Sequence, residues 1–246
     1  EASTLSSAGG EGASDEDLFK DPQPRDECPI CMLPLPFDDG ATAYFSCCGK
    51  TACKGCIHGV KQQDARCLCP FCRTPAPTSN RDYIEWVKKR VEADDAQAHY
   101  ILGGYYYRGL MGMRKNTAKG NKLFLRAGEL GCAMGYNNIG YSYHNGEGVG
   151  RDVEKAKYYF ELAAMGGDVK SRHNLGIIEE RAGNIQRAVK HWMIAAGAGH
   201  DESLKEIRTC FLDGDATKDD FEKALRTHQE SRDQMTSDQR EAAPAL

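Results

Sequence analysis

Residues 133–167 read AMGYNNIGYSYHNGEGVGRDVEKAKYYFELAAMGG, and the same pattern recurs in weaker form on both sides of this stretch. It contains two helical segments on either side of a glycine-rich loop at 145–152. The recurring landmarks are Ile101-Leu102-Gly103, Asn138-Ile139-Gly140 and Asn174-Leu175-Gly176, then Phe124, Phe160 and Trp192, then Gly131, Gly167 and Gly199. A period of this length with two helices per unit predicts an all-α helical-repeat solenoid.

Small residues at the recurring Ala and Gly positions allow paired helices to cross closely, and the aromatic positions fill the layer between them. Residues 203–212 fit the first helix of a fourth, incomplete unit. Thr217 and Asp220 then have the spacing of a capping box, which predicts a polar-faced helix to about Gln234. Such a helix would cover the last apolar face of the solenoid.

These repeats resemble the Sel-one-like repeat, a TPR-related α/α solenoid family. The resemblance covers residues 96–213, and the unit that carries it best has the family residues Gly140, Tyr143, Gly146-x-Gly148-Val149, Asp152, Lys155-Ala156 and Ala163-Ala164. The first unit departs at Gly120 and in the loop 111–116, and the third lacks the Gly-x-Gly-Val loop. The resemblance implies an adaptor scaffold that binds other proteins.

Upstream of the repeats, residues 78–95 predict a connecting helix, because Ser79 can cap it and Ile84, Val87 and Val91 share one face. Lys88-Lys89-Arg90 on this helix could be a nuclear-localisation or nucleic-acid patch. A solvated helix face is the favoured interpretation.

Residues 27–77 hold nine of the eleven cysteines of the chain. Three C-x2-C pairs (Cys28/Cys31, Cys53/Cys56 and Cys69/Cys72) favour tetrahedral zinc, since each tight turn can direct two thiolates at one ion. So few large apolar residues cannot build an adequate core, and metal binding would supply the folding energy. A disulfide framework is disfavoured because no leader pattern is seen and two further cysteines are isolated. A thioredoxin-type redox site would need one C-x2-C pair within a strand–helix unit and not three.

This block resembles a RING finger, the zinc module of ubiquitin ligases. The resemblance rests on Cys28-Pro29-Ile30-Cys31, Cys48-Gly49-Lys50-x-x-Cys53-x-x-Cys56-Ile57 and Cys69-Pro70-Phe71-Cys72-Arg73. It implies a cross-braced α+β fold with two zinc ions. Cys28, Cys31, Cys53 and Cys56 would hold the first, and Cys69 and Cys72 would join a middle pair on the second.

The middle pair departs from the RING pattern, because Lys50 occupies the usual histidine position and a charged lysine has no free lone pair. The simplest solution is that Cys47 and Cys48 both bind metal. Cys67 or His58 remains an alternative to this pair.

The RING resemblance also implies partners, a ubiquitin-conjugating enzyme and ubiquitin, with an unknown substrate or adaptor bound by the repeats. Ile30, Pro70 and Phe71 would form the enzyme-binding groove, Val60 stands where many RING fingers have tryptophan, and Arg73 matches the residue that hydrogen-bonds both enzyme and ubiquitin. Local packing is the alternative role for Ile30 and Phe71, and solvated charge for Arg73.

Two other functions compete with a RING-type ubiquitin ligase: a non-catalytic zinc-binding adaptor or assembly scaffold, and a redox sensor that uses Cys67. Cys132 and Cys210 are expected to be buried solenoid residues. The tyrosines at 105–107, 141, 143, 158 and 159 could line a peptide site, although packing between helices is favoured.

The composition limits the remaining classes. A formal net charge of −4 argues against a general nucleic-acid surface, and no apolar run is long enough to span a membrane. Residues 1–26 are acidic, poor in large apolar residues and without a signal-peptide pattern, which predicts a disordered segment. Reduced cysteines favour a cytoplasmic or nuclear location. The expected order is residues 1–26 disordered, 27–77 zinc module, 78–95 connecting helix, 96–213 repeats and 214–246 capping helix and tail.

Overall fold

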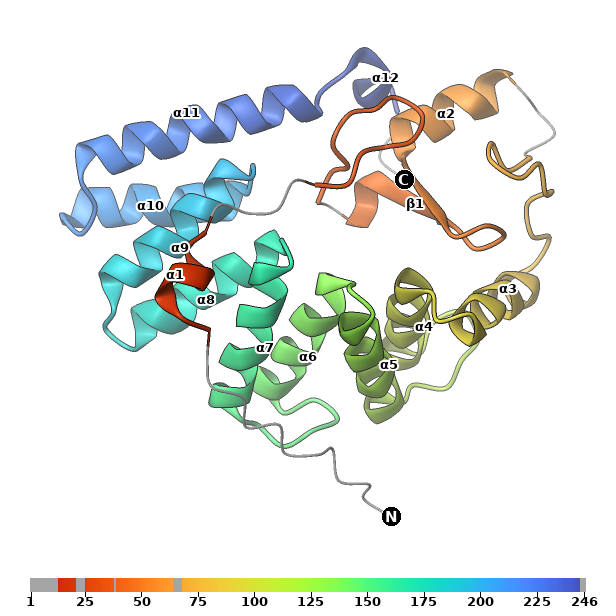
Figure 1. The fold of residues 1–246 in the computed structure, drawn as a ribbon, viewed down its shortest axis with the longest axis horizontal. Coiled ribbons are helices and arrows are strands. Elements are labelled where there is room, and N and C mark those ends of the chain that lie inside the picture. The colour runs from red at the N-terminus through yellow and green to blue at the C-terminus, as the bar shows by residue number, and fades with distance from the viewer. Residues whose placement is uncertain (1–12, 21–24, 38, 64–67, 244–246) are drawn as a thin grey trace.

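The computed structural model describes residues 13–20, 25–37, 39–63 and 68–243. Two parts make up the molecule, an arc of antiparallel helices and a small cysteine-rich module with one two-stranded sheet (Figure 1). The described residues contain no helix that is both long and apolar enough to cross a membrane.

Three helix pairs form the arc, and each pair corresponds to one sequence repeat. The first pair is α4 (Ala96–Arg108) and α5 (Thr117–Glu129), the second α6 (Ala133–Asn145) and α7 (Val153–Met165), and the third α8 (Val169–Arg181) and α9 (Ile185–Gly197). Consecutive helices pack against each other along the whole series. The solenoid predicted from the repeat period is therefore present.

Close crossing within each pair depends on one glycine, as the repeat pattern predicts. A Cβ atom on Gly140 would lie 2.8 Å from the Phe160 ring, and one on Gly176 would lie 2.3 Å from Nε1 of Trp192. Phe160 is 2% exposed and Trp192 is fully buried. Each aromatic ring thus fills the space that the absent side chain leaves in the opposite helix.

Polar caps begin most of the repeat helices. The side chain of Asp152 accepts a hydrogen bond from the backbone N–H of Lys155 at 3.0 Å, and Asp168 accepts one from Ser171 at 2.7 Å. These contacts satisfy N–H groups that have no partner within the helix.

The carboxyl-terminal end of the arc has the cap that the sequence predicts. Helix α10 (Asp201–Asp213) follows the third pair, and Thr217 and Asp220 form the predicted capping box at the start of α11 (Lys218–Met235). Helix α11 packs on α9 and α10 and crosses back toward the cysteine-rich module, where the short α12 (Asp238–Glu241) contacts α2 (Lys54–Gln63) (Figure 1).

The cysteine-rich module consists of a 3-10 turn η1 (Asp39–Ala41), the antiparallel hairpin β1 (Thr42–Phe45) and β2 (Lys50–Cys53), and helix α2. Helix α3 (Asn80–Glu92) connects it to the repeats and packs on α4. Ser79 caps α3 through the N–H of Asp82, as expected.

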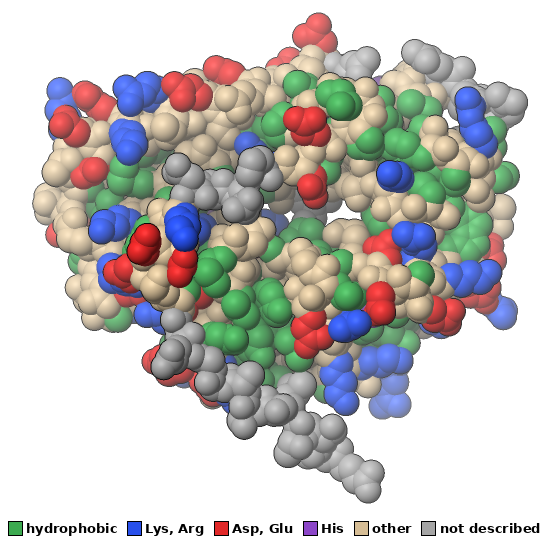
Figure 2. Space-filling view, in the orientation of Figure 1, with side chains coloured by type: hydrophobic (Ala, Val, Ile, Leu, Met, Phe, Trp, Pro, Cys, Tyr) green, Lys and Arg blue, Asp and Glu red, His purple; other side chains and the backbone are tan. Residues whose placement is uncertain are grey.

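The module contacts both ends of the arc, which closes the molecule into a ring. At the far end, the rings of Phe37 and His200 lie 5.9 Å apart, and Arg25 donates to the Ser231 hydroxyl at 3.1 Å. The space-filling view shows the face hollowed at the centre of this ring (Figure 2).

Two expectations from the sequence need correction. Lys88 and Lys89 are exposed, but Arg90 is part of the junction with the module and forms an ion pair with Asp95 at 2.7 Å. Within the segment predicted to be disordered, residues 13–20 have a defined place against the arc, and Asp15–Leu18 form helix α1 with Leu18 fully buried. The prediction failed because the residues that bury Leu18 are far away in sequence.

Candidate metal centre

Two turns of the module repeat one backbone pattern around a C-P-x-C sequence. In the first, the Cys28 N–H donates to Leu33 at 2.9 Å and the Met32 N–H to Cys28 at 2.8 Å. In the second, the Cys69 N–H donates to Thr74 at 2.9 Å and the Arg73 N–H to Cys69 at 3.0 Å. Met32 and Arg73 both have positive φ, 58° and 61°. Each turn thereby folds its two sulfur atoms toward the same side.

The middle cysteines lie in the tight turn of the β-hairpin. Phe45 pairs with Lys50 across the sheet, and the Phe45 carbonyl accepts from the N–H groups of Cys48 at 3.1 Å and Gly49 at 2.8 Å. Gly49 has φ +74°, a conformation that favours glycine. This turn allows two adjacent cysteines to contribute to one cluster.

Eight sulfur atoms gather in two groups of four. The first group contains Cys28, Cys31, Cys53 and Cys56, and the second contains Cys47, Cys48, Cys69 and Cys72. Within each group the sulfur atoms all lie within 4.8 Å of one another. The groups interleave along the chain, so each ties together segments from both halves of the module.

The spacing of the sulfur atoms suits a shared metal ion better than disulfides. Cys31 and Cys53 are 3.9 Å apart, Cys48 and Cys69 3.8 Å, and Cys47 and Cys72 3.5 Å. A disulfide needs about 2 Å, and all ten described cysteines are free. A tetrahedral ion with bonds of about 2.3 Å separates its sulfur ligands by about 3.8 Å. Both groups could therefore hold a metal ion.

The thiol pKa values differ within each sulfur group. Burial, reinforced by neighbouring thiols, raises the pKa of Cys47 and of Cys56 well above the usual range. Burial also opposes ionisation of Cys28, but backbone N–H groups, including that of Cys53 at 3.4 Å, bring its pKa to about 7. Hydrogen bonding to Thr74 lowers the pKa of Cys72 to about 6. A divalent cation compensates the repulsion among such thiolates.

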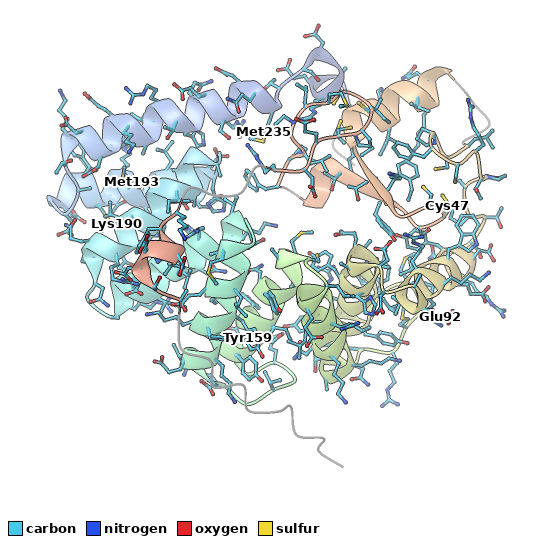
Figure 3. All side chains as sticks on the ribbon, in the orientation of Figure 1. Cys47, Glu92, Tyr159, Lys190, Met193 and Met235 are labelled. Atoms are coloured by element: carbon cyan, nitrogen blue, oxygen red, sulfur yellow. The ribbon has the colours of Figure 1, made fainter. Side chains whose placement is uncertain are left out.

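Arg240, from α12, covers the first cysteine group. Its guanidinium donates to Sγ of Cys31 at 3.5 Å and to the carbonyls of Leu33 at 3.3 Å and Pro34 at 2.9 Å. Met235, at the end of α11, lies at the same junction (Figure 3). Nothing in the sequence indicated this role, since Arg240 is more than 180 residues from the nearest cysteine of its group.

Among the described residues, neither His58 nor Lys50 belongs to either sulfur group. Lys50 is an exposed residue of β2, and the His58 ring lies on α2, hydrogen-bonded to Gln62 at 3.2 Å. Cys67 lies outside the described residues. The described residues thus place Cys47 and Cys48 in the second group without the help of His58.

The residues expected to contact a partner differ in exposure. Ile30, between the first two cysteines, is 39% exposed, and the Arg73 side chain is also exposed. Val60 and Pro70 are half-buried. Phe71 packs edge-on against Phe45, with ring centroids 5.5 Å apart. Phe71 therefore makes the local packing contact that was its alternative role, and its contact with a partner stays a prediction.

The tyrosines and isolated cysteines of the arc are mostly packing residues. Tyr143 is 8% exposed and stacks on Tyr159, whereas Tyr141 is 51% exposed. Cys132 and Cys210 are buried, as expected.

The fold and the site define a helical-repeat protein with a module of two four-cysteine clusters. Residues 96–132 and 133–168 match the Sel1 repeat family, so the first two helix pairs of the arc are Sel1 repeats, and the third pair continues the same solenoid. Sel1 repeats mediate protein–protein interaction.

Curated relatives match this chain over short stretches. The ERAD-associated E3 ubiquitin-protein ligase component HRD3B of Arabidopsis thaliana is 33% identical over 103 residues, 42% of this chain and 16% of that protein. The DAP3-binding cell death enhancer 1 of Rattus norvegicus is 41% identical over 64 residues, 24% of this chain and 13% of that protein. The chain thus spans less than a fifth of either relative.

Solved structures agree with the solenoid. A Sel1 repeat protein from Oxalobacter formigenes has a TM-score of 0.55 at 28% identity, covering 63% of this chain and 64% of its own. The uropathogenic Escherichia coli antigen c5321, described as having an SLR fold, has a TM-score of 0.52 at 26% identity, covering 62% of this chain and 33% of its own.

Proposed function

We propose that the cysteine-rich module is a RING-type zinc finger and that the protein is a ubiquitin ligase. The observation that carries this proposal is the interleaving of the two sulfur groups. Cys28/Cys31 and Cys53/Cys56 form one group, and Cys47/Cys48 and Cys69/Cys72 form the other. This alternation of pairs along the chain is the cross-brace of a RING finger. The Arabidopsis relative is named as a component of a ubiquitin-protein ligase, which supports the same direction.

Zinc fits the donor set. Four thiolates at tetrahedral spacing favour zinc over magnesium or calcium, which prefer oxygen ligands. Bound there, zinc would supply folding energy and rigidity and take no part in the reaction. Thiolate sites of this kind persist in a reducing compartment, which fits the cytoplasm or nucleus.

In this proposal the protein acts by positioning. Ile30, 39% exposed beside the first group, and the half-buried Val60 and Pro70 form the surface for a ubiquitin-conjugating enzyme. The exposed Arg73 donates hydrogen bonds that hold the enzyme and its ubiquitin in one orientation. Fixing the thioester near the attacking amine raises the rate without a covalent intermediate on this chain. The Sel1 repeats recruit the substrate or adaptor.

A non-catalytic adaptor is the second candidate, because two observations favour it. Helix α12 packs against α2, the helix that carries Val60, and Phe71 is engaged by Phe45. Both reduce the surface left for a conjugating enzyme.

A ubiquitination assay separates the two functions. The zinc-loaded chain is incubated with ubiquitin, activating enzyme and a panel of conjugating enzymes, and chain formation is followed with time. A ligase forms chains with at least one enzyme, and Ile30→Ala and Arg73→Ala each reduce the rate at least ten-fold. Met32→Ala is a matched control, because Met32 is exposed in the same turn. If no enzyme supports chain formation, the ligase proposal fails and the adaptor remains.

A further inference from the structure

Residues 13–20 lie against helices α7, α8 and α9 as a bound peptide would. Leu18 is fully buried in the same core cluster as Phe160, Ala164 and Leu175. Ser14 caps the single turn of α1 through the Asp17 N–H. We call the surface of α7, α8 and α9 that this segment covers the groove. Figure 2 shows acidic side chains of the segment next to Lys and Arg side chains.

Polar contacts fix the direction of this segment. Arg172 of α8 donates to the Leu18 carbonyl, and Arg187 of α9 pairs with the Asp15 carboxylate. At the other end, the Ala13 N–H donates to the Glu161 carboxylate at 3.4 Å.

Phe19 occupies a second position beside the leucine. Its ring lies 4.7 Å from the buried His191 ring, and Arg187 and Lys190 lie over its face at 5.3 and 5.5 Å. Lys190 is marked beside α1 in Figure 3. The groove therefore contacts an acidic residue, a leucine and an aromatic ring in a fixed order.

The repeat register shows that this groove departs from the solenoid pattern. We aligned the units on their shared landmarks. At the positions of Arg172, Glu179 and His191, the second unit has Tyr136, Tyr143 and Tyr159. At the position of Glu161, the first unit has Leu125. Arg172 is 3% exposed, and neither ring nitrogen of the fully buried His191 has a hydrogen-bond partner among the described residues. Packing of the arc does not require buried charges here, whereas recognition of a polar peptide does.

We propose that this groove is a binding site for partner peptides with an acidic residue three positions before a Leu-Phe pair. Residues 13–20 are its built-in occupant, and a partner peptide binds by displacing them. This inference rests on the part of the proposed function that assigns partner recruitment to the repeats. It is independent of the zinc module.

A peptide-binding experiment on the full chain tests the site. The probe is a fluorescent peptide ASDEDLFK, residues 13–20 with blocked ends, and binding is measured by anisotropy without ubiquitin or conjugating enzyme. The double variant Leu18→Ala/Phe19→Ala weakens the built-in occupant, and we expect it to bind the probe at least ten-fold more tightly than the wild-type chain, because a competing segment lowers apparent affinity. Glu16→Gln is the matched control and leaves the affinity unchanged.

A charge exchange tests the recognition itself. Arg187→Glu, added to the double variant, weakens binding of the probe, and a probe with Asp15→Lys recovers it. A probe with Leu18→Ala does not bind. Far-UV circular dichroism checks that the variants keep their helices. If the double variant unfolds, Asp15→Lys in the chain replaces it, because this substitution weakens the built-in segment and leaves Leu18 and Phe19 in place.

Three results would overturn the inference. The first is equal affinity of the probe for the wild-type chain and the double variant. The second is equal affinity of the Leu18→Ala probe. The third is a wild-type chain that sediments as a dimer and a double variant that sediments as a monomer. The segment would then bind a second copy of the chain. Because no ubiquitin is present, loss of ligase activity leaves these outcomes unaffected.

Discussion

The hydroxyl of Tyr44 donates a 2.8 Å hydrogen bond to the carboxylate of Asp95, across the junction between the cysteine-rich module and the repeats. The same carboxylate accepts from Arg90 and caps α4 through the Ala98 N–H at 3.0 Å. One aspartate thus joins a strand of the module, the connecting helix and the first repeat helix.

Tyr44→Phe removes one hydrogen bond to a charged group and leaves the other partners of Asp95 in place. We expect the free energy of unfolding to fall by about 1–2 kcal/mol, measured by urea denaturation at pH 7. Tyr141→Phe is the matched control, because Tyr141 is 51% exposed on α6, and its effect should stay within about 0.5 kcal/mol. Equal effects of the two substitutions would show that the Tyr44–Asp95 hydrogen bond contributes nothing to the free energy of unfolding.

Two glycines of the module make a second comparison. Gly49 has positive φ, and a Cβ there would lie 2.1 Å from the Arg90 guanidinium, whereas a Cβ on Gly59 of α2 would meet nothing within 4 Å. We expect Gly49→Ala to lower the thermal midpoint through strain and displacement of Arg90. Gly59→Ala should raise stability by up to about 1 kcal/mol, because alanine favours the helix. Equal tolerance of both substitutions would contradict the close contact at Gly49.

The buried His191 predicts a dependence of stability on pH. Burial, with the nearby Arg172 charge, lowers the pKa of His191 to about 3, against about 6.5 in the unfolded chain. Between these values the unfolded state binds one more proton, so stability falls as pH drops below about 6.5. From pH 7 to 5 this group should remove about 2 kcal/mol.

The variant His191→Leu isolates that effect, since leucine occupies the equivalent position, Leu123, in the first repeat. Urea denaturation at pH 7 and pH 5 should show a smaller loss of stability in the variant by about 2 kcal/mol. Parallel pH profiles for the two proteins would mean that His191 is protonated in the fold.

The parts of the structure that local patterns encode were predictable. The repeat period and the Gly140–Phe160 type of crossing are properties of single helix pairs, so they appear in the sequence as spacing. The middle cysteines were also assigned correctly to one cluster, because Lys50 could not ligate and Cys47 lay next to Cys48.

The contacts that the sequence did not reveal join distant segments. Leu18 is buried by helices that begin more than 130 residues later, and Arg240 reaches a cysteine group from the opposite end of the chain. A short acidic segment and a charged tail look solvated when considered alone, because their burial depends entirely on tertiary partners.

Arg240 gives a prediction about metal retention. Arg240→Ala removes the donor to Cys31 and to two carbonyls of the first turn, and loss of such a partner lowers metal affinity by about ten-fold or more. Metal release to a chromogenic chelator should accelerate accordingly. Arg73 lies within the second turn and its side chain is exposed, so Arg73→Ala should release metal at the wild-type rate. Equal rates of metal release from the two variants would contradict a role of Arg240 in metal retention.

The central claim, two zinc ions held by eight thiolates, is tested most directly by metal analysis of the chain purified under reducing conditions without added metal. The account predicts two zinc ions per chain and a loss of at least one in the Cys47→Ser/Cys48→Ser double variant, while Cys67→Ser and His58→Ala retain both. A content well below two in the wild-type chain, or two ions retained when Cys47 and Cys48 are both replaced, would contradict it.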